Sequence, residues 1–446
     1  MKPSRMLSGP ISRISHQVLM NGGNELRKTT GGTDALALAA VADINSRRPA
    51  SADGERFLSG RAFVFNQLKH PDEAITLRTI YRDAFHLIGV HCAEEVRREY
   101  LTVGRSMSQQ EADILISRDK GDEEEEHGQK VTETFQYADV FIDFEKFDMR
   151  SSRDATEQVC RYFDLLFGRK ILTPTPDEYG MFLAQSAALR SADLSRQVGA
   201  AILSPTHEVI SVGTNEVPSG GGGQYWGTEE SHRDLERGAD ANALEKDRIL
   251  KEVLAVSVPG WEEMGTESQI TTLRDASKKL KTSRIMNLTE FGRAVHAEMD
   301  AILAAGRVGV PVRGCTLYCT TFPCHNCAKH IINAGIQRVV YVEPYPKSMA
   351  RELHSDAIRF GAEAIEGKKV WFEAFPGVAP RMYSSLFSMA NAFGSRHRRK
   401  KPDGTVQELG QVSLRIKGVP LSYIEREETS ADLFRRSLLT LESTKE

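Results

Sequence analysis

This chain of 446 residues has few of the features that mark membrane, secreted or nucleic-acid-binding proteins. No apolar run approaches the roughly 20 residues that a membrane-spanning helix needs, so we expect no membrane partner. Six cysteines are few for this length and do not form the dense pattern of a disulfide-stabilised secreted domain. A formal net charge of −3 supplies no overall basic field, so nucleic acid is not an expected partner, although a local basic patch remains open.

Signals for export and for phosphate binding are missing as well. Within residues 1–20, Pro10, Ser12 and Arg13 interrupt the apolar core that a signal peptide requires, and we expect a cytoplasmic protein. No Gly-x-x-x-x-Gly-Lys-Ser/Thr phosphate loop occurs in the sequence. We therefore do not expect this chain, as it stands, to hydrolyse or transfer a nucleotide phosphate.

The composition is that of a globular protein, with 40% hydrophobic and 27% charged residues. The length predicts two to three domains. A proline-marked linker near Thr173 separates a predicted first domain, residues 1–172, from a second at 173–390, which a C-terminal tail follows at 391–446. A glycine-rich stretch opens a polar insertion at about 219–287, which we interpret as a lid or as a regulatory and assembly surface.

The first domain is predicted to be α/β with a parallel sheet. Strands are expected at 62–65, 85–90 and 138–144, with helices from His70 to Tyr81 and from Thr156 to Leu166. Strands that alternate with helices in this way indicate a parallel sheet covered on both faces. The acidic run at 122–126 is interpreted as a solvated loop, because metal sites seldom use five consecutive acids.

The second domain is predicted to alternate in the same way. We expect a helix from Met181 to Ala192 and strands at 198–203, 209–213, 317–320, 337–342 and 370–372. In the tail, the basic run at 396–401 is expected to be a solvated loop, with phosphate contact left open. Segments at 414–417 and 433–441 are expected to pack back as a strand and a helix.

The strongest chemical signal lies between residues 291 and 327. His296, Cys324 and Cys327 are of the ligand types that bind zinc, and three protein ligands leave a fourth position for water. Zinc can lower the pKa of bound water from about 15.7 to about 7, and a carboxylate beside the metal can then move protons. We therefore predict Zn²⁺ as the cofactor, with Glu298 as the catalytic residue and a non-ligand.

Local structure is expected to bring these side chains together. Good helix formers follow His296, so residues 296 and 298 should project from the first turn of a helix. Pro323 suits the start of a second helix, on which Cys324 and Cys327 are one turn apart and point the same way. A redox pair is the alternative for Cys-x-x-Cys alone, and a ribbon-type site is excluded because only one such pair is present. The remaining cysteines are expected to be inert core residues: Cys92, Cys160, Cys315 and Cys319.

Four segments of the second domain carry a family resemblance. They are Arg196-Gln197-Val198-Gly199-Ala200-Ala201, Gly213-Thr214-Asn215-Glu216-Val217-Pro218-Ser219-Gly220, His296-Ala297-Glu298 and Pro323-Cys324-His325-Asn326-Cys327. The last two form the H-x-E and P-C-x-x-C signature of zinc-dependent nucleobase deaminases. Over about 175–375 the chain resembles the dCMP deaminase branch of the cytidine deaminase superfamily. The resemblance implies a three-layer α/β/α fold, zinc held by the histidine and the two cysteines, and proton transfer by Glu298.

The same resemblance implies two contacts with substrate. The Asn215 side chain would bind the sugar hydroxyl, and the backbone amide of Ala297 would touch the base carbonyl. Capping a turn after the predicted strand at 209–213 is the alternative role for Asn215. Tyr345 follows the predicted strand at 337–342 and can stack on a base at the mouth of the site. Ordinary packing at the rim is the alternative role for Tyr345.

The whole layout is also similar to bacterial two-domain deaminases that carry a P-loop-kinase-like domain and act in anti-phage defence by draining dCTP and dCMP. The matching segments are 65–73, 85–90, 128–130 and 138–142. The chain departs from that pattern because it lacks the N-terminal strand and the phosphate loop. The first domain is therefore expected to serve regulation or assembly if the chain is complete.

These observations favour hydrolytic deamination of a deoxycytidine nucleotide, either dCMP or dCTP, by a homo-oligomeric enzyme. One alternative is a deaminase that acts on cytosine or adenine in RNA or DNA, which should show a basic groove with aromatic stacking residues. The other is a non-catalytic nucleotide sensor. Glu298 argues against a sensor, because a binding module does not need a proton carrier.

Overall fold

The computed structural model describes residues 16–48, 61–120, 128–144, 148–228, 230–280, 283–345, 348–360, 368–390, 399–407 and 420–443. The chain divides into two compact units, of which the first contains residues 1–173 and 376–446 and the second contains residues 174–375. Residues 376–390, which the sequence analysis assigned to the second domain, thus lie in the first unit, as does the predicted tail. Within the described residues, none of the helices combines the length and apolarity needed to cross a membrane.

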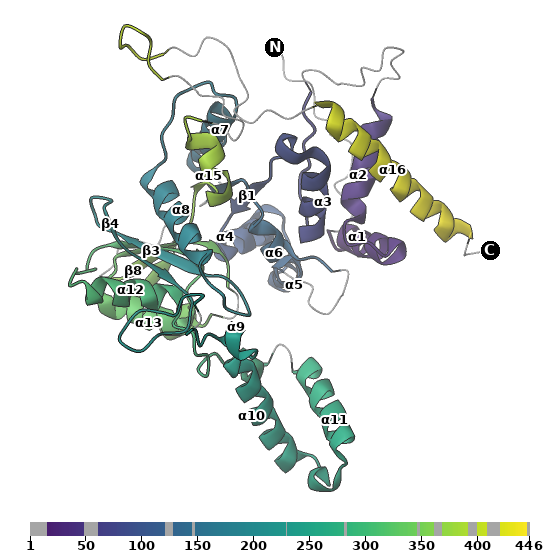
Figure 1. Ribbon diagram of the computed structural model, residues 1–446. Coiled ribbons are helices and arrows are strands. Elements are labelled where there is room, and N and C mark those ends of the chain that lie inside the picture. The colour runs from purple at the N-terminus through teal and green to yellow at the C-terminus, as the bar shows by residue number, and fades with distance from the viewer. Residues whose placement is uncertain are drawn as a thin grey trace. The chain divides into compact units, whose positions relative to one another are not determined.

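The first unit contains a small mixed sheet with the strand order β1-β2-β9 (Figure 1). β1 (Ile88–His91) runs parallel to β2 (Val140–Asp143), and β9 (Gly377–Val378) pairs antiparallel with β2. The strands expected at 85–90 and 138–144 are therefore present, and within the described residues they are the parallel pair of this sheet. The strand predicted at 62–65 is wrong, because these residues form no ladder and Val64 is 89% exposed.

Helices make up most of the first unit. They are α1 (His16–Thr30), α2 (Ala35–Ser46), α3 (Pro71–Tyr81), α4 (Glu94–Glu99), α5 (Gln109–Lys120), α6 (Val131–Phe135), α7 (Met149–Leu166), α15 (Pro380–Phe387) and α16 (Pro420–Ser443), with a 3-10 turn η1 (Arg82–Ala84) and a π-turn η2 (Tyr100–Gly104). The helix predicted from His70 to Tyr81 is confirmed as α3. His70 caps it by accepting the Asp72 N–H, and the Glu73 carboxylate accepts the His70 N–H in return.

The C-terminal helix α16 is an integral part of the first unit. It packs on α2 and α3, beside which it lies in Figure 1. The carboxylate of Glu427 is buried against Arg48 of the segment after α2 and accepts the Tyr81 hydroxyl at 2.9 Å. The predicted helix at 433–441 is thus the end of a longer one, while the segments at 122–126 and 414–417 lie outside the described residues, as do residues 396–398 of the basic run.

The second unit is built on a six-stranded mixed sheet with the order β4-β3-β5-β6-β8-β7. Its strands are β3 (Gly199–Leu203), β4 (Val209–Thr214), β5 (Thr316–Thr321), β6 (Arg338–Glu343), β7 (Ile358–Phe360) and β8 (Val370–Ala374). β3 is antiparallel to both β4 and β5, and the other pairs are parallel. Its helices are α8 (Pro176–Ala188), α9 (Asp234–Arg237), α10 (Ala241–Ser257), α11 (Thr266–Lys279), α12 (Ala297–Arg307), α13 (His325–Ala334) and α14 (Ala350–Leu353), with 3-10 turns η3 (Trp261–Glu263) and η4 (Arg284–Asn287).

Two glycines let helices approach both faces of this sheet. A Cβ on Gly213 would overlap the carbonyl oxygen of Ala297 in α12, and a Cβ on Gly199 would overlap the backbone of α8. The two glycines face opposite sides, because Gly199 pairs with Thr214 while Gly213 pairs with Ala200. The sheet therefore lies between α8 on one face and α12 with its neighbour α13 on the other, which gives three layers.

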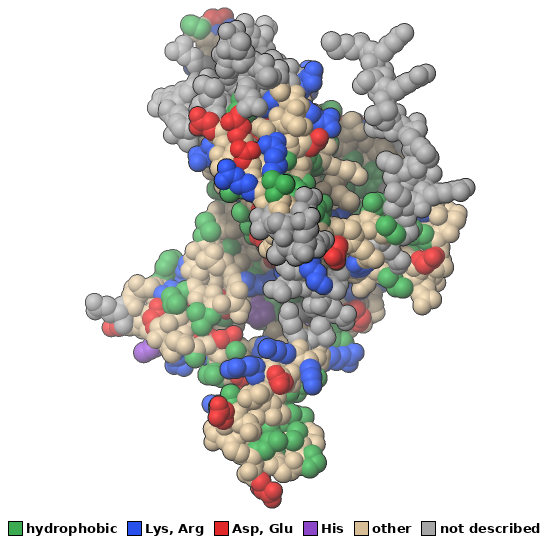
Figure 2. Space-filling view, turned by 90° about the vertical axis from the view of Figure 1, so that its right-hand side faces the viewer, with side chains coloured by type: hydrophobic (Ala, Val, Ile, Leu, Met, Phe, Trp, Pro, Cys, Tyr) green, Lys and Arg blue, Asp and Glu red, His purple; other side chains and the backbone are tan. Residues whose placement is uncertain are grey.

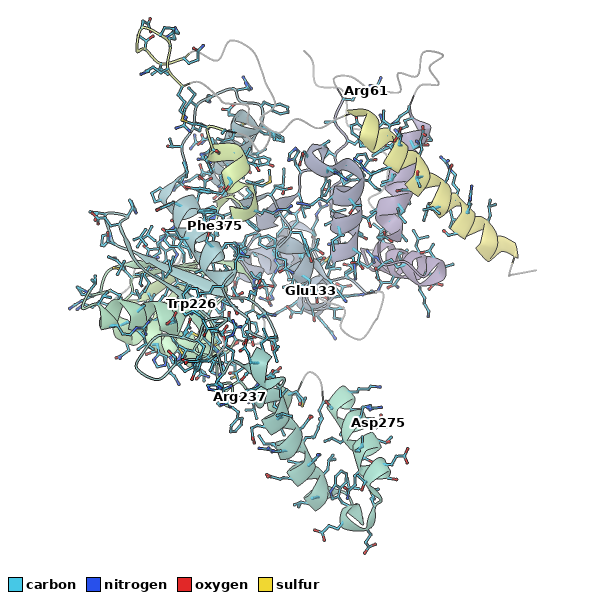
Figure 3. The ribbon with its side chains drawn as sticks, viewed as in Figure 1. Arg61, Glu133, Trp226, Arg237, Asp275 and Phe375 are labelled. Carbon is cyan, nitrogen blue, oxygen red and sulfur yellow. The ribbon has the colours of Figure 1, made fainter. Side chains whose placement is uncertain are left out.

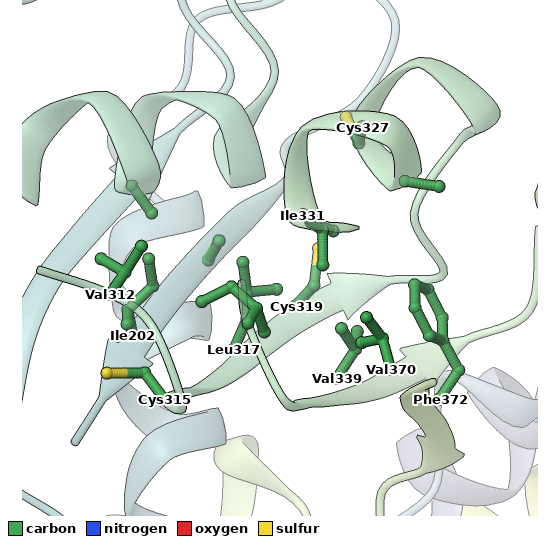
Figure 4. Close-up of a cluster of buried hydrophobic side chains, with 14 of the residues drawn as sticks. Ile202, Val312, Cys315, Leu317, Cys319, Cys327, Ile331, Val339, Val370 and Phe372 are labelled. Carbon is green, nitrogen blue, oxygen red and sulfur yellow. The ribbon is translucent and has the colours of Figure 1, made fainter. Parts of the chain in front are cut away.

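The main core of the second unit lies between the sheet and the pair α12 and α13. Figure 4 shows strand residues such as Leu317, Cys319 and Val339 packed beneath Ile331 and Cys327 of α13. All five side chains are fully buried. The helix that carries two of the predicted metal ligands is thus fixed to the sheet by apolar packing.

The predicted insertion forms a helical hairpin. α10 and α11 pack against each other and project from the sheet, with Arg237 labelled at the root of the hairpin and Asp275 on its second helix in Figure 3. The hairpin has its own small interior, since Leu250 and Trp261 are buried. Its outer surface exposes Val253, Val256 and Ile270, and Figure 2 shows hydrophobic side chains gathered over this part of the molecule.

Candidate metal centre

The first predicted ligand lies at the start of α12. His296 is the N-cap residue, with an extended backbone (φ −67°, ψ 152°), and its carbonyl accepts the Asp300 N–H at 2.8 Å. Glu298 is the second residue of the helix. Because the two side chains leave the same helical end, the imidazole and the carboxylate are positioned by one short piece of backbone.

The second and third ligands lie at the start of α13. Cys324 is the N-cap residue, and its sulfur accepts the Cys327 N–H at 3.4 Å. Helix α13 therefore begins after Cys324, two residues later than the start expected at Pro323. Both sulfurs still face the same point, because an N-cap side chain folds back over the first turn.

The three donor atoms converge. His296 Nδ1 lies 3.2 Å from Cys327 Sγ and 3.4 Å from Cys324 Sγ, and the two sulfurs are 3.6 Å apart. Bond lengths of about 2.3 Å to sulfur and 2.0–2.1 Å to nitrogen in a tetrahedral zinc site would separate these atoms by about 3.5–3.8 Å. One imidazole nitrogen and two sulfurs at these separations fit Zn²⁺, and within the described residues they form a potential metal-binding group.

Of the three donors, Cys324 is the one whose pKa is shifted towards the deprotonated, metal-binding form. Hydrogen bonding to Cys327 and to His296 lowers the pKa of the Cys324 thiol to about 4, which favours the thiolate. The hydrogen bond to Cys324 raises the pKa of His296 to about 9, and burial raises that of Cys327. Without a metal the site would hold protons on His296 and Cys327, and a metal ion would displace them because it binds the deprotonated forms.

Glu298 lies beside this cluster rather than in it. Its side chain is buried, and it interacts with the thiols of Cys327 and Cys319. Burial raises the pKa of Glu298, and the nearby Cys324 adds to the effect. A buried carboxylate next to the three donors is positioned to exchange protons with a molecule at the metal.

Asn215 is held by the loop before β3. Its Oδ1 accepts the Val198 N–H at 2.7 Å, and its Nδ2 donates to the Arg196 carbonyl at 2.8 Å. The side chain is 7% exposed. Each amide atom retains capacity for one further hydrogen bond, so Asn215 can both fix the loop and contact a ligand.

The two remaining predicted contacts are Ala297, which follows His296 directly, and Tyr345, which packs against the cluster that contains Cys324 and Cys327. Ala297 is fully buried as the first residue of α12, where its N–H is one of the donors that a helix leaves unpaired. Tyr345 is half-buried and packs against the core cluster that contains Cys324 and Cys327. The packing role and the stacking role predicted for Tyr345 are compatible with this position.

Two residues near the site were not among the predicted site residues. The Arg196 guanidinium lies 5.7 Å from the centre of the Tyr345 ring and 3.5 Å from the Glu343 carboxylate, with its side chain half exposed. Cys319 is buried beneath Glu298. The sequence signal for Arg196 was its place in the first of the four family-like segments. For Cys319, the apolar strand around it indicated a core position, and the residue is buried.

Comparison with known proteins assigns a family to this region. Residues 174–343 match the family described as the cytidine and deoxycytidylate deaminase zinc-binding region. Deoxycytidylate deaminases are also among the relatives of the chain. The family match covers the metal donors, Glu298 and Asn215 but not Tyr345.

The chain resembles several known proteins over part of its length. It is 47% identical over 66 residues to ComE operon protein 2 of Bacillus subtilis, covering 15% of this chain and 35% of that protein. It is 27% identical over 165 residues to the deoxycytidylate deaminase of Pongo abelii, covering 37% of this chain and 63% of that enzyme. The chain thus spans less than two thirds of either relative. Among solved structures, the dCMP deaminase of cyanophage S-TIM5 in complex with dCMP and dUMP is 18% identical, with a TM-score of 0.27, over 46% of this chain and 98% of that one.

Proposed function

We propose that the second unit catalyses the hydrolytic deamination of a deoxycytidine nucleotide, with dCMP as the first substrate to test. The products would be the deoxyuridine nucleotide and ammonia. The observation that carries the proposal is the convergence of His296, Cys324 and Cys327 on one point with Glu298 beside them. The deaminase family match and the deoxycytidylate deaminases among the relatives support the choice of substrate.

His296 Nδ1 and the two cysteine sulfurs would hold Zn²⁺ and leave a fourth position for water. When bound, zinc lowers the pKa of that water to about 7 and so supplies a nucleophile at neutral pH. The oxygen of water would bond to the ring carbon, and the bond from that carbon to the amino group would break. The two protons of water would finish on the ring nitrogen and on the departing ammonia.

Glu298 is the residue that would carry those protons. It would take one from water, pass it to the ring nitrogen, and then deliver the second to the amino group as that group leaves. A carboxylate bound to the metal would do this poorly. The position of Glu298 beside the three donors supports the role of proton carrier.

We assign substrate recognition to four groups. Asn215 would bind the sugar hydroxyl, the Ala297 amide would donate to the base carbonyl, and Tyr345 would stack on the base. Arg196 adds a cation next to Tyr345, and a guanidinium is well suited to a phosphate. A cation at this place supports a nucleotide rather than a nucleoside as the substrate.

The test is ammonia release by the purified full chain loaded with zinc. It would be incubated separately with dCMP, dCTP, cytidine and a cytosine-containing oligonucleotide. We expect turnover of dCMP, and turnover of dCTP would identify the triphosphate as an additional or preferred substrate. Activity on the oligonucleotide alone would overturn the proposal and favour a nucleic-acid deaminase, whereas nucleotide binding without ammonia release would favour a sensor.

We also propose that the enzyme is a cytoplasmic homo-oligomer and that its first unit is a degenerate P-loop-kinase-like domain. The similarity to two-domain anti-phage deaminases motivates a role in nucleotide depletion during phage infection. Measuring dCTP and dCMP pools in infected bacteria that express the chain or its Glu298→Ala variant would test this role. Equal pools in the two strains would contradict it.

A further inference from the structure

We propose that the first unit contains a second ligand site, a pocket for a small organic anion that carries a ring with an N–H donor. The pocket has a volume of about 360 Å³, which lies within the range of about 300–1,000 Å³ for small-molecule sites. All of its lining residues belong to the first unit, whereas the metal centre belongs to the second. The proposal does not depend on the deaminase activity.

One residue that lines this pocket has a buried amide oxygen without a hydrogen-bond partner among the described residues. Gln129 is only 3% exposed, and its Oε1 accepts no hydrogen bond from the described residues. The chain beside it is fixed, because the Lys130 N–H donates to the Lys69 carbonyl at 2.7 Å. Buried carbonyl oxygens in folded proteins almost always accept a hydrogen bond. We therefore infer that a molecule in the pocket offers an N–H or O–H donor to the Gln129 amide oxygen.

A guanidinium without an acid supplies the second polar group. Arg97 of α4 lines the pocket, its Nε is buried without a hydrogen-bond partner, and no carboxylate among the described residues pairs with it. The other two cations of the lining are neutralised. Arg27 donates to the Glu73 carboxylate at 2.6 Å, and Lys69 pairs with Asp119. Among the described residues of the lining, the charge without a partner is therefore positive, which favours an anionic group on the ligand.

Apart from Gln67, the rest of the lining is apolar and aromatic. Leu36, Leu101, Leu115 and Ile116 surround the pocket, together with the Tyr100 ring. Tyr100 and Leu101 open the π-turn η2, which widens the backbone directly after α4. Such turns occur frequently at functional sites. An apolar wall with one aromatic ring suits a flat ring better than a small inorganic ion.

The ligand class combines these three demands: a ring, a donor for Gln129 and an anion for Arg97. Nucleoside monophosphates and amino-aryl carboxylates both meet them. Titration calorimetry of the full chain would use AMP, GMP and 4-aminobenzoate as probes. Adenosine, which has a ring but no anion, and inorganic phosphate, which is an anion without a ring, serve as reference compounds. Arg97→Gln and Gln129→Met remove the two polar groups. Their matched controls are Arg153→Gln and Gln109→Met, which change exposed residues that do not line the pocket.

We expect at least one ring-bearing anion to bind one per chain with a Kd below about 1 mM, and each pocket variant to weaken it by about tenfold or more. The matched controls and Cys324→Ser should leave binding unchanged, and adenosine and phosphate should bind at least about tenfold more weakly. Circular dichroism verifies that each variant is folded, and Gln129→Met, which is nearly isosteric, remains informative if Arg97→Gln is not. Absence of binding by all three probes would overturn the proposal. The proposal would also be overturned if phosphate bound as tightly as the best probe or if both pocket variants kept the parent affinity. Loss of binding in Cys324→Ser would overturn it as well.

Discussion

Arg48 and Glu427, which are 379 positions apart in the chain, form a two-pronged ion pair in the interior of the first unit. Arg48 Nε and Nη2 donate to the two carboxylate oxygens of Glu427 at 2.6 and 2.7 Å. The side chains are 4% and 0% exposed. The pair links the segment after α2 to the C-terminal helix, so the first unit depends on the last part of the chain.

Removing one partner of this pair should strongly destabilise the first unit. Glu427→Ala removes the carboxylate that accepts two hydrogen bonds from the buried Arg48 guanidinium, and we expect a loss of about 3–5 kcal/mol in the free energy of unfolding. The double variant Arg48→Met/Glu427→Leu should recover most of that loss, because it removes both charges. Calorimetry of the first-unit transition measures both effects. Arg47→Ala, which breaks the exposed pair with Asp43, is the control and should cost less than about 1 kcal/mol.

Asp177 should make the second unit sensitive to acid. It accepts hydrogen bonds from Arg338 at 2.6 and 2.8 Å and from the Tyr318 hydroxyl at 2.8 Å. Burial alone would raise the pKa of Asp177, but the hydrogen bonds and charge of Arg338 outweigh burial and hold it below its usual value. The carboxylate therefore stabilises the fold above the unfolded pKa of about 3.9, and this contribution is lost as the pH falls through the lower folded pKa.

The variant that tests this linkage is Asp177→Asn. Its melting temperature should lie below that of the parent at pH 7, and the gap should narrow as the pH is lowered from 5 towards 3. Thermal melts across this pH range provide the measurement. A gap that stays constant over the range would show that Asp177 does not contribute through its charge.

Gly213 should be intolerant of any side chain. Its added Cβ would overlap the Ala297 carbonyl and the backbone of Ala301, so Gly213→Ala must displace α12. We expect a destabilisation of about 3 kcal/mol or more together with a lower zinc content, because His296 leads into that helix. Gly220→Ala is the matched control, since a Cβ there meets nothing within 4 Å. Equal melting temperatures and metal content in the two variants would contradict the close approach.

Metal binding and turnover should separate cleanly between two variants. Cys324→Ser removes one of three donors and is expected to lose both zinc and activity. Glu298→Gln should retain about one zinc per chain while losing activity by about 100-fold or more. Elemental analysis with the ammonia assay tests both, and exposed Cys160→Ser is the control that should retain both properties. Full activity in Glu298→Gln would exclude the proton-carrier role.

Some parts of this structure could be predicted from the sequence because they depend on local chemistry. The ligand spacing predicted that His296, Cys324 and Cys327 meet, because each lies at a helix start whose backbone fixes the side chain. The sequence also contained the signals for the start of α8. The helix was predicted to begin at Met181, whereas it begins at Pro176. Thr175 caps that helix and Glu178 completes the capping box, with Pro176 at its first position. The proline pair suggested a linker, although a proline after a threonine also favours a helix start.

Other features depend on contacts between distant segments and have no local signal. Nothing near residue 427 indicates that its carboxylate pairs with Arg48. The apolar run at 62–65 resembled a strand because short apolar runs do not reveal whether a sheet partner exists. Cys160 was expected in the core and is exposed, since a helix periodicity around it does not show which face is covered. Asn215 was predicted to contact the substrate. Its hydrogen bonds to the backbone of Val198 and Arg196 became evident only from the structure.

The interleaving of the two units has a consequence for biosynthesis. All residues of the second unit, 174–375, leave the ribosome as one uninterrupted stretch, while the first unit contains residues on both sides of it. The first unit can therefore close only after the second has been synthesised, because α16, which supplies Glu427, follows residues 174–375 in the chain. During synthesis Arg48 lacks its Glu427 partner until residues 174–375 have been made.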